Sequence, residues 1–345
     1  MLELIGRSEK LFEDDIEIHK EKLYEIVSNS KFLVLGGAGS IGQAVTKEIF
    51  KRKPLKLHVV DLSENNMVEL VRDIRSSYGY IEGDFKTFAL DIGSIEYDAF
   101  FESDGNYDYV LNLSALKHVR SEKDPFTLMR MINVNIFNTD KTIKQSIKKG
   151  VKKYFCVSTD KAANPVNLMG ASKRIMEMFV NRSSKDINIS MARFANVAFS
   201  NGSLLDGYIQ RLLQRQPISC PSDVKRFFVS PQESGEICLM TCILGDSGDI
   251  FFPKLIENQL VSFKKITEDL FMYLNKKIHI CSSETEAKDY ASKMRDNSAY
   301  PVYFFKTDTF SCITEPQNQK SKIDHDSFLR TVELLHSITS EYTYR

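Results

Sequence analysis

The chain has 345 residues, of which 42% are hydrophobic and 27% charged, as in an ordinary globular protein. Its 46 basic residues balance 46 acidic ones, so the composition provides no excess positive charge for a nucleic acid, and we expect no nucleic-acid partner. No stretch approaches the roughly 18 apolar residues that span a bilayer, and the length favours two joined lobes over one core.

The N-terminal residues and the cysteines both indicate a reducing, cytoplasmic setting without a membrane partner. The first fifteen or so residues include an acidic Glu13-Asp14-Asp15 run, unlike a signal or transit peptide. The cysteines are scattered, with no C-x-x-C pair and no Cys/His cluster at zinc spacing. We therefore predict reduced, mostly buried thiols and no metal site. The cysteines are Cys156, Cys220, Cys238, Cys242, Cys281 and Cys312.

Strand and helix patterns alternate along the first half of the chain. Residues 1–30 are polar with weak helical periodicity and predict an N-terminal helical arm. Residues 31–193 predict a Rossmann-type, doubly wound α/β domain with a parallel sheet covered on both faces. Beyond Arg193 the alternation weakens, and we expect residues 194–345 to form a smaller substrate-binding lobe with a C-terminal extension. The strands are expected at 32–35, 57–60, 85–90, 109–113 and 154–157, and helices at 41–50, 67–74 and 128–148.

A glycine cluster, Gly36-Gly-Ala-Gly-Ser-Ile-Gly42, follows the first strand and opens the first helix of this domain. In that context glycines allow a tight turn and let a pyrophosphate approach backbone N–H groups at a helix N-terminus. A purely structural turn is the alternative. The predicted cofactor-binding residues here are Gly36, Gly39, Ser40, Ile41 and Gly42.

The second strand ends at Asp61, where a carboxylate can accept hydrogen bonds from an adenosine ribose. Residues 62–71 contain no Arg or Lys that could hold a 2′-phosphate, which favours NAD over NADP. Asp91 and Ile92, just past the third strand, are placed to contact the adenine, although a surface Asp at a strand end fits equally well. Ser114 and Ala115, after the fourth strand, complete the predicted cofactor site.

The fifth strand runs into Ser158-Thr-Asp-Lys161, and a helix begins near Met169-Gly-Ala-Ser-Lys173. Extended short-chain dehydrogenase/reductases carry a Ser or Thr after this strand and a Tyr-x-x-x-Lys on the next helix. Met169 stands where that Tyr would be. With the segment 164–173, this pattern closely resembles the polysaccharide-biosynthesis nucleotide-sugar 4,6-dehydratases. It is most similar to UDP-N-acetylglucosamine 4,6-dehydratases that retain the C5 configuration, over about residues 33–245.

The resemblance implies a lyase that uses NAD to oxidise C4 of the sugar, eliminate water across C5 and C6, and return hydride to C6. It implies that Lys173 orients the nicotinamide ribose, while Thr159 can hydrogen-bond the C4 hydroxyl. Because Met169 cannot take a proton, Asp160 is the nearest carboxylate that can, and it could then assist departure of the C6 oxygen. Lys161 is then the C5 base, which requires a neutral amine. For Met169, simple core packing is the alternative.

Six further residues are candidates for binding the UDP-sugar substrate. A Lys-His pair follows the fourth strand, where a solvated turn is the alternative. Arginines can bind a diphosphate in bidentate fashion, although each could instead form a structural ion pair. The candidates are Lys117, His118, Arg193, Asn196, Ser203 and Arg226.

Two other functions remain open at this stage. A nucleotide-sugar 4-epimerase would share the fold and the C4 oxidation, but epimerases usually keep the Tyr and lack Asp-Lys after the Thr. An NAD-sensing Rossmann protein without enzymatic activity tends to lose the catalytic Lys, whereas Lys161 and Lys173 are both present. We also predict a homo-oligomer, a dimer or higher.

Overall fold

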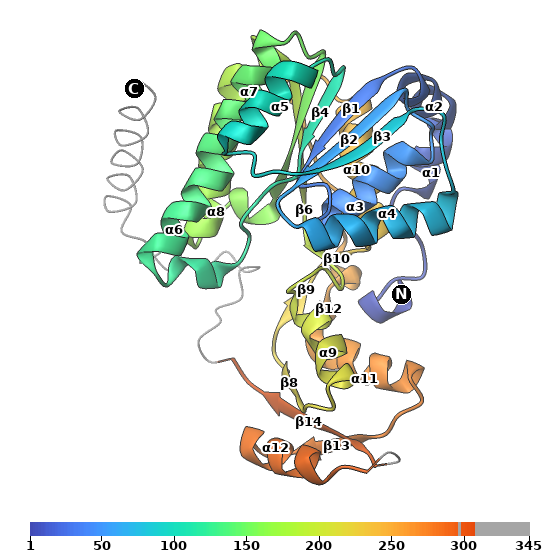
Figure 1. The fold of residues 1–345 in the computed structure, drawn as a ribbon. Helices are drawn as coiled ribbons and strands as arrows, with labels where there is room; N and C mark the ends of the chain where they lie inside the picture. Colours follow the sequence, from blue (N-terminus) through green and yellow to red (C-terminus); the bar gives the residue numbers. More distant parts are fainter. Residues whose placement is uncertain (296–297, 308–345) are drawn as a thin grey trace. The chain divides into compact units, whose positions relative to one another are not determined.

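The computed structural model describes residues 1–295 and 298–307, which divide into two compact units (Figure 1). The larger unit contains residues 14–194 and 235–252. The smaller unit contains residues 1–13 and 195–234 and the described residues from 253 onward. Cys312 and the rest of the predicted C-terminal extension from residue 308 onward lie outside the described residues.

The larger unit is built on one sheet of seven parallel strands, in the order β11-β6-β5-β4-β1-β2-β3. The order reverses between β1 and β4, which makes their carboxyl ends the switch point of the sheet. The predicted doubly wound parallel sheet is therefore confirmed. Its strands are β1 (Lys31–Leu35), β2 (Lys56–Asp61), β3 (Asp84–Ala89), β4 (Tyr109–Asn112), β5 (Lys153–Thr159), β6 (Asn188–Phe194) and β11 (Ile250–Phe251).

Helices cover both faces of this sheet (Figure 1). On one face, apolar side chains of the strands are buried against three helices in a core that includes Leu33, Tyr97, Ile143 and Met176. Those helices are α5 (Ile95–Asp104), α7 (Asn138–Lys148) and α8 (Leu168–Ser183), with α6 (Pro125–Ile132) running through a π-helical turn (Asn133–Phe137) into α7. The other face carries α3 (Ser40–Phe50), α4 (Glu64–Tyr78) and α10 (Pro231–Leu244), and α1 (Glu13–Ile18) and α2 (Lys20–Ser28) precede the sheet.

Short polar side chains begin several of these helices. Ser63 and Ser94 accept hydrogen bonds from backbone N–H groups in the first turns of α4 and α5. Asn167 does the same for α8, where its Oδ1 accepts the Gly170 N–H at 2.8 Å. Each cap satisfies a backbone donor that the helix itself cannot pair. The cap at Asn167 fixes where α8 starts, and therefore where Lys173 stands.

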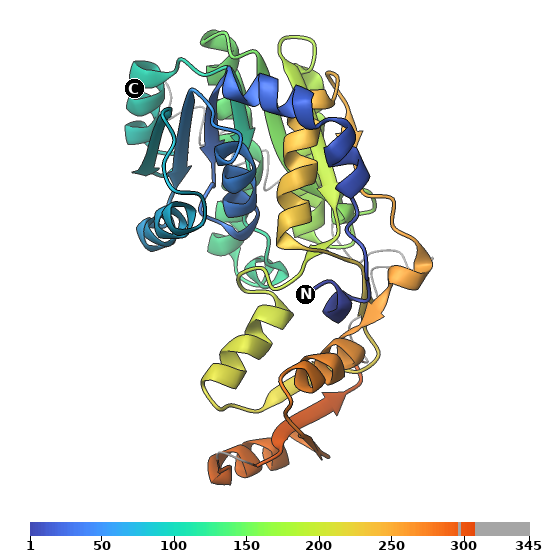
Figure 2. The ribbon, with the colours of Figure 1, turned by 90° about the vertical axis from the view of Figure 1, so that its right-hand side faces the viewer.

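Residues 235–252 belong to the larger unit, whereas the sequence placed everything after residue 193 in a second lobe. A Cβ atom at Gly235 would lie 2.7 Å from backbone atoms of Ala44, so α10 packs directly on α3. Strand β11 then adds to the sheet beside β6, with Ile250 opposite Met191. Figure 2 shows α10 running alongside the sheet. A strand of two residues after a polar turn gives no periodicity, so the pattern could not reveal it.

The N-terminal arm is also divided between the units, because residues 1–13 belong to the smaller one. Ile5 is fully buried in the core of that unit. Arg7 forms a buried ion pair with Glu233, with Nη1 2.7 Å from Oε1. Leu11 N–H donates to the same carboxylate at 2.9 Å. These contacts, which join residues far apart in the sequence, fix the first segment to the smaller unit.

The smaller unit contains a three-stranded parallel sheet in the order β13-β14-β8. Its core includes Tyr208, Ile218, Phe271 and Val302. The strands are β8 (Ile218–Pro221), β13 (Ile278–Cys281) and β14 (Tyr300–Phe305), and the helices are a 3-10 turn (Glu3–Ile5), α9 (Leu204–Leu213), α11 (Phe263–Tyr273) and α12 (Glu284–Lys293). Two short ladders pair β10 (Phe228–Val229) with β7 (Asn196–Val197), and β12 (Val261–Ser262) with β9 (Lys225–Arg226).

Candidate functional site

The candidate site lies at the carboxyl edge of the seven-stranded sheet. The register places Leu35 of β1 beside Val60 of β2 and Asn112 of β4, and Asn112 beside Cys156 of β5. All four strands are parallel, so the segments that follow them emerge along one edge, where ligands bind in open α/β sheets. The predicted cofactor and catalytic segments of the larger unit are thus neighbours.

The loop after β1 has the backbone conformation that only glycine adopts easily. Gly36 has a φ of +71° and donates its N–H to Val60 O at 2.8 Å. A Cβ atom at Gly36 would lie 2.7 Å from Ser114 N, and one at Gly42 would lie 2.1 Å from Gly36 O. Gly39 is the N-cap of α3 and has no side chain to cover the N–H groups of the first turn. Ser40, Ile41 and Gly42 form that turn, which suits a phosphate group.

Asp61 is hydrogen-bonded to the glycine loop. Its Oδ2 accepts the Ala38 N–H at 2.9 Å, and its Oδ1 accepts the Ser63 N–H at 2.9 Å. The carboxylate therefore stands at the end of β2, as the sequence predicts, and also holds the loop in place. A carboxylate has four lone-pair positions, so these two bonds leave acceptor capacity for a ribose hydroxyl.

The segment after β3 has a structural role in the described residues. Asp91 Oδ1 accepts the Gly93 N–H at 2.8 Å within a tight turn. The side chain of Ile92 is buried in the sheet's core. The contact of either residue with an adenine stays a prediction.

The segment after β4 is held by a buried amide that the sequence did not single out for this role. Asn135 is fully buried; its Oδ1 accepts the Leu116 N–H at 2.9 Å, and its Nδ2 donates to Leu116 O at 3.0 Å. Nδ2 also lies 3.0 Å from Ser172 Oγ on α8. This amide fixes the loop that carries Ser114, Ala115, Lys117 and His118 relative to the helix that carries Lys173. Lys117 and His118 are both exposed.

Three predicted catalytic groups at the end of β5 form a continuous hydrogen-bonded chain. Thr159 Oγ1 donates to Asp160 Oδ1 at 2.8 Å, and Lys161 Nζ lies 3.1 Å from the same oxygen. The Lys161 side chain is 20% exposed and that of Asp160 is 49% exposed. A hydroxyl, a carboxylate and an amine thus converge at the site's edge, with one oxygen of Asp160 shared between the other two.

Lys173 and Met169 are both buried on α8. Lys173 Nζ donates to Val157 O at 3.0 Å and lies 3.5 Å from Met176 Sδ. Burial lowers the pKa of Lys173 because removal from water disfavours its charged form. Met169 packs in the interior and its N–H donates to Glu122 Oε1 at 2.7 Å. The side chain that replaces the expected Tyr is therefore an apolar packing group at a helix N-terminus.

A buried carboxylate, Glu177, is the main residue that the sequence did not reveal. It accepts hydrogen bonds from Ser158 Oγ at 2.6 Å, from Arg193 Nε at 2.7 Å and Nη2 at 2.5 Å, and from Arg174 Nη1 at 3.2 Å. Burial opposes its ionisation, but the bonds from Arg193 and Ser158 outweigh this and lower the pKa of Glu177. The network joins β5, α8 and β6. Its signal in the sequence is an acid four residues after Lys173 on the same helix.

Arg193 forms an ion pair with Glu177, the alternative to diphosphate binding that the sequence left open, and its contact with a substrate stays a prediction. Both of its hydrogen-bonding nitrogens point to Glu177, and Glu177 is completely buried. The hydrogen bonds that Arg193 donates to this carboxylate raise the pKa of the guanidinium. The guanidinium serves first to neutralise a buried charge.

Three of the predicted substrate residues, Asn196, Ser203 and Arg226, belong to the smaller unit. Ser203 is the N-cap of α9 and accepts the Asp206 N–H at 3.2 Å. Asn196 Nδ2 donates to Phe227 O at 3.4 Å, and Arg226 Nη1 donates to Lys225 O at 2.8 Å. Ser203 thus has a capping role. The contact of all three with a substrate stays a prediction.

A doubly wound sheet with a glycine loop at its switch point defines a Rossmann-like short-chain dehydrogenase/reductase fold. The sequence profile of the polysaccharide biosynthesis protein family matches residues 32–290. The chain belongs to this family.

Relatives of this chain include proteins named as nucleotide-sugar 4-epimerases and as 4,6-dehydratases. The chain is 30% identical over 252 residues to an uncharacterized membrane protein of Methanocaldococcus jannaschii, covering 71% of this chain and 70% of the relative. It is 28% identical to a UDP-glucose 4-epimerase of Rickettsia rickettsii, covering 69% and 70%. It is also 28% identical to an inverting UDP-N-acetylglucosamine 4,6-dehydratase of Campylobacter jejuni, covering 66% and 68%. The family is thus shared by dehydratases and epimerases.

Solved structures share the fold. Pen from Bacillus thuringiensis superposes with a TM-score of 0.65 at 22% identity, covering 81% of this chain and 79% of that one. The dTDP-glucose 4,6-dehydratase DesIV of Streptomyces venezuelae, solved with NAD bound, gives 0.60 at 17% identity, covering 89% and 97%. Within residues 1–295 and 298–307, no helix is long and apolar enough to cross a membrane.

Proposed function

We propose that this protein is an NAD-dependent UDP-N-acetylglucosamine 4,6-dehydratase. The observation that carries the proposal is the hydrogen-bonded chain of Thr159, Asp160 and Lys161 at the carboxyl end of β5. A dehydratase needs both an acid and a base beside the sugar, and this segment supplies a carboxylate and an amine next to a hydroxyl. The buried Met169 supports the same assignment, because the proton has to be moved by groups other than a Tyr.

The larger unit fits an NAD molecule by the shape of its glycine loop. Cβ atoms at Gly36 and Gly42 would collide with backbone, so glycines permit the tight turn that leads into the N-terminus of α3, where a pyrophosphate can bind. Asp61 stands at the end of the adjacent strand with acceptor capacity for the ribose. When bound, NAD supplies an acceptor for the C4 hydride and later a donor of hydride to C6.

The chain's own residues then move the protons. Thr159 holds the C4 hydroxyl, and its hydrogen bond to Asp160 gives that proton a route to a carboxylate. Asp160, once protonated, donates to the departing C6 oxygen, which leaves as water. Lys161 takes the C5 proton and later returns one to C5. Lys173, buried beneath this segment, orients the ribose next to the reacting carbons.

The decisive experiment is incubation of the purified protein with UDP-N-acetylglucosamine. The expected product has lost the mass of one water and carries a C4 ketone, with no net formation of NADH. A product of unchanged mass with inverted C4 would identify a 4-epimerase instead. Bound NAD with neither product would support the non-enzymatic alternative, and NADH formed in proportion to substrate would contradict a recycled cofactor. Proton couplings in the product distinguish retention from inversion at C5.

A further inference from the structure

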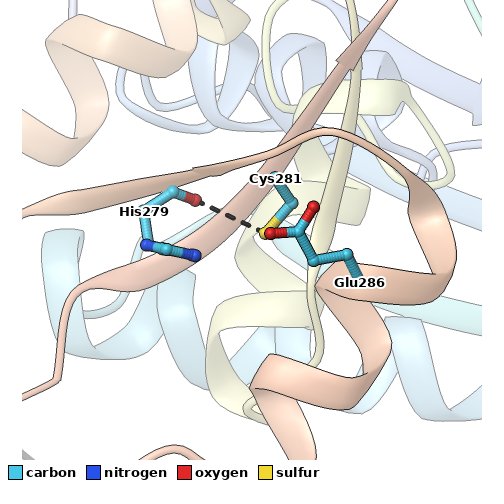
Figure 3. A group of neighbouring side chains, drawn as sticks. All are labelled: His279, Cys281 and Glu286. Atoms are coloured by element: carbon cyan, nitrogen blue, oxygen red, sulfur yellow. Dashed lines mark hydrogen bonds between the residues drawn. The ribbon is translucent and has the colours of Figure 1, made fainter.

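Three potential metal ligands gather in the smaller unit, well away in sequence from the residues discussed above. His279 and Cys281 are two residues apart on β13, so they share one face of the strand. Glu286 is in the first turn of α12, the helix that follows β13. Figure 3 shows the three side chains gathered between the strand and the start of the helix. A ligand atom from each lies within 4.8 Å of those from the other two.

The surrounding groups orient two of these ligands. Ser282 donates to Glu286 Oε2 through its N–H at 2.7 Å and its Oγ at 2.5 Å. These bonds hold the carboxylate and leave Oε1 to face other partners. The imidazole of His279 stacks on Tyr290 of α12, with ring centroids 4.0 Å apart and an interplanar angle of 12°. Outer contacts of this kind are typical of built metal sites, where they fix ligand direction.

Cys281 completes the arrangement from inside the unit. Its side chain is buried, and its thiol donates to His279 O at 3.7 Å (Figure 3). Coordination would release the thiol proton to solvent and replace the weak S–H···O contact with a metal–thiolate bond.

We propose that His279, Cys281 and Glu286 bind one divalent transition-metal ion, with Zn²⁺ as the preferred ion. Imidazole nitrogen, thiolate sulfur and carboxylate oxygen together match zinc rather than calcium or magnesium, which require oxygen ligands. Three protein ligands leave a fourth tetrahedral position for water. The ion would connect β13 to α12 and stabilise the smaller unit.

This site departs from the expectation that the chain binds no metal. The sequence contains no Cys/His cluster at zinc-finger spacing. The third ligand is the carboxylate of Glu286, which the turn between β13 and α12 places beside His279 and Cys281. The recognisable signal is His-x-Cys on a strand followed by an acid in the first turn of the next helix. The proposal is independent of the dehydratase assignment, since none of the three residues belongs to the larger unit.

The test uses the untagged full chain, stripped with a chelator and titrated with Zn²⁺ by calorimetry and with Co²⁺ by absorption. We expect one ion per chain and a thiolate-to-cobalt charge-transfer band. His279→Ala, Cys281→Ser and Glu286→Gln should each weaken Zn²⁺ binding at least tenfold, and Ser282→Ala should weaken it about 10–100-fold, the usual effect of losing an outer contact.

Glu284→Gln is the matched control, because Glu284 is also in the first turn of α12 but pairs with Lys288. It should leave Zn²⁺ affinity unchanged. Glu286 is exposed, so Glu286→Gln tests the site even if Cys281→Ser fails to fold. Unchanged affinity in Glu286→Gln and His279→Ala, or a cobalt complex without the thiolate band, would overturn the proposal.

Discussion

Two strand–turn–helix units of this protein place polar groups at the carboxyl end of a parallel strand, but they stabilise those groups differently. In the larger unit, β5 leads through residues 159–161 to α8. The supporting acid Glu177 is completely buried and receives four hydrogen bonds. In the smaller unit, β13 leads to α12, and the corresponding acid Glu286 is exposed and accepts hydrogen bonds from the N–H and the hydroxyl of Ser282.

The difference shows two ways of preparing a site. The β5–α8 unit balances its charges internally, so Ser158 and the adjoining segment proposed for catalysis are fixed before any ligand arrives. The β13–α12 unit brings a nitrogen, a sulfur and an oxygen within 4.8 Å of one another. We therefore expect the β5–α8 segment to depend on its own side chains for stability and the β13–α12 segment to depend on a bound ion.

The largest expected effect concerns catalysis by the residues that follow β5. Lys161→Ala should slow water elimination by about 10²–10⁴-fold, the usual contribution of a positioned base, while UDP-sugar still binds. The C4 ketone and NADH should then accumulate, and mass spectrometry and absorbance would measure them. In D₂O the wild-type product should carry one deuterium at C5 and none at C6.

Lys185→Ala is the control for Lys161→Ala, because Lys185 is an exposed lysine after α8. It should leave the elimination rate unchanged. If Lys161→Ala eliminates water at a near wild-type rate with the same labelling, the base is not Lys161, and Asp160 becomes the candidate.

A smaller effect, on stability, compares the two acids directly. Glu177→Ala should lower the free energy of unfolding by about 3 kcal/mol, because it leaves the guanidinium of Arg193 without its buried partner. Glu286→Gln in metal-free protein should change it by less than about 0.5 kcal/mol, as expected at an exposed position. Urea denaturation followed by circular dichroism measures both. Equal losses of unfolding free energy in the two variants would contradict the contrast between the β5–α8 and β13–α12 segments.

Much of the larger unit could be predicted because its signals are local. Strands β1, β2, β4 and β5 contain short apolar runs and β3 mixes apolar with polar residues, and each is followed by a turn or a helix pattern, so the pattern locates them. The glycine loop and Asp61 directly follow their strands in the sequence, and the pairing of β1 with β2 brings the Ala38 N–H to Asp61. Local order in the sequence therefore specified both the fold class and the placement of the cofactor loop.

The rest depends on contacts between distant segments. The ion pair of Arg193 with Glu177 on α8 can be recognised only once β6 is placed beside β5. Strand β11 has two residues and is defined only by its pairing with β6. The Arg7–Glu233 pair likewise assigns the first residues to the smaller unit by a contact across most of the chain. No pattern within one segment contains this information.

The pH dependence of stability should follow the buried acid. The pKa of Glu177 is lowered in the folded state, so its contribution is complete above its ordinary pKa of 4.5 and is lost as the pH falls through the lower folded value. Below about pH 4.5, the unfolding free energy of the wild type should therefore fall more steeply than that of Glu177→Gln. The difference is at most about 1.4 kcal/mol per pH unit for one proton. Parallel curves for the two proteins, measured by urea denaturation, would contradict this linkage.

The smallest effect concerns the caps that begin the two helices. Asn167 accepts the Gly170 N–H at the start of α8, and Ser283 accepts the Glu286 N–H at 3.1 Å at the start of α12. Replacing either with Ala should cost about 1 kcal/mol of unfolding free energy, because a backbone donor loses its partner. Only Asn167→Ala should also slow dehydration, since α8 carries Lys173 six residues further on, while α12 carries no group proposed for catalysis. Rate and stability measured on both variants separate the two roles, and a slower reaction in Ser283→Ala would show that α12 supports the catalytic site after all.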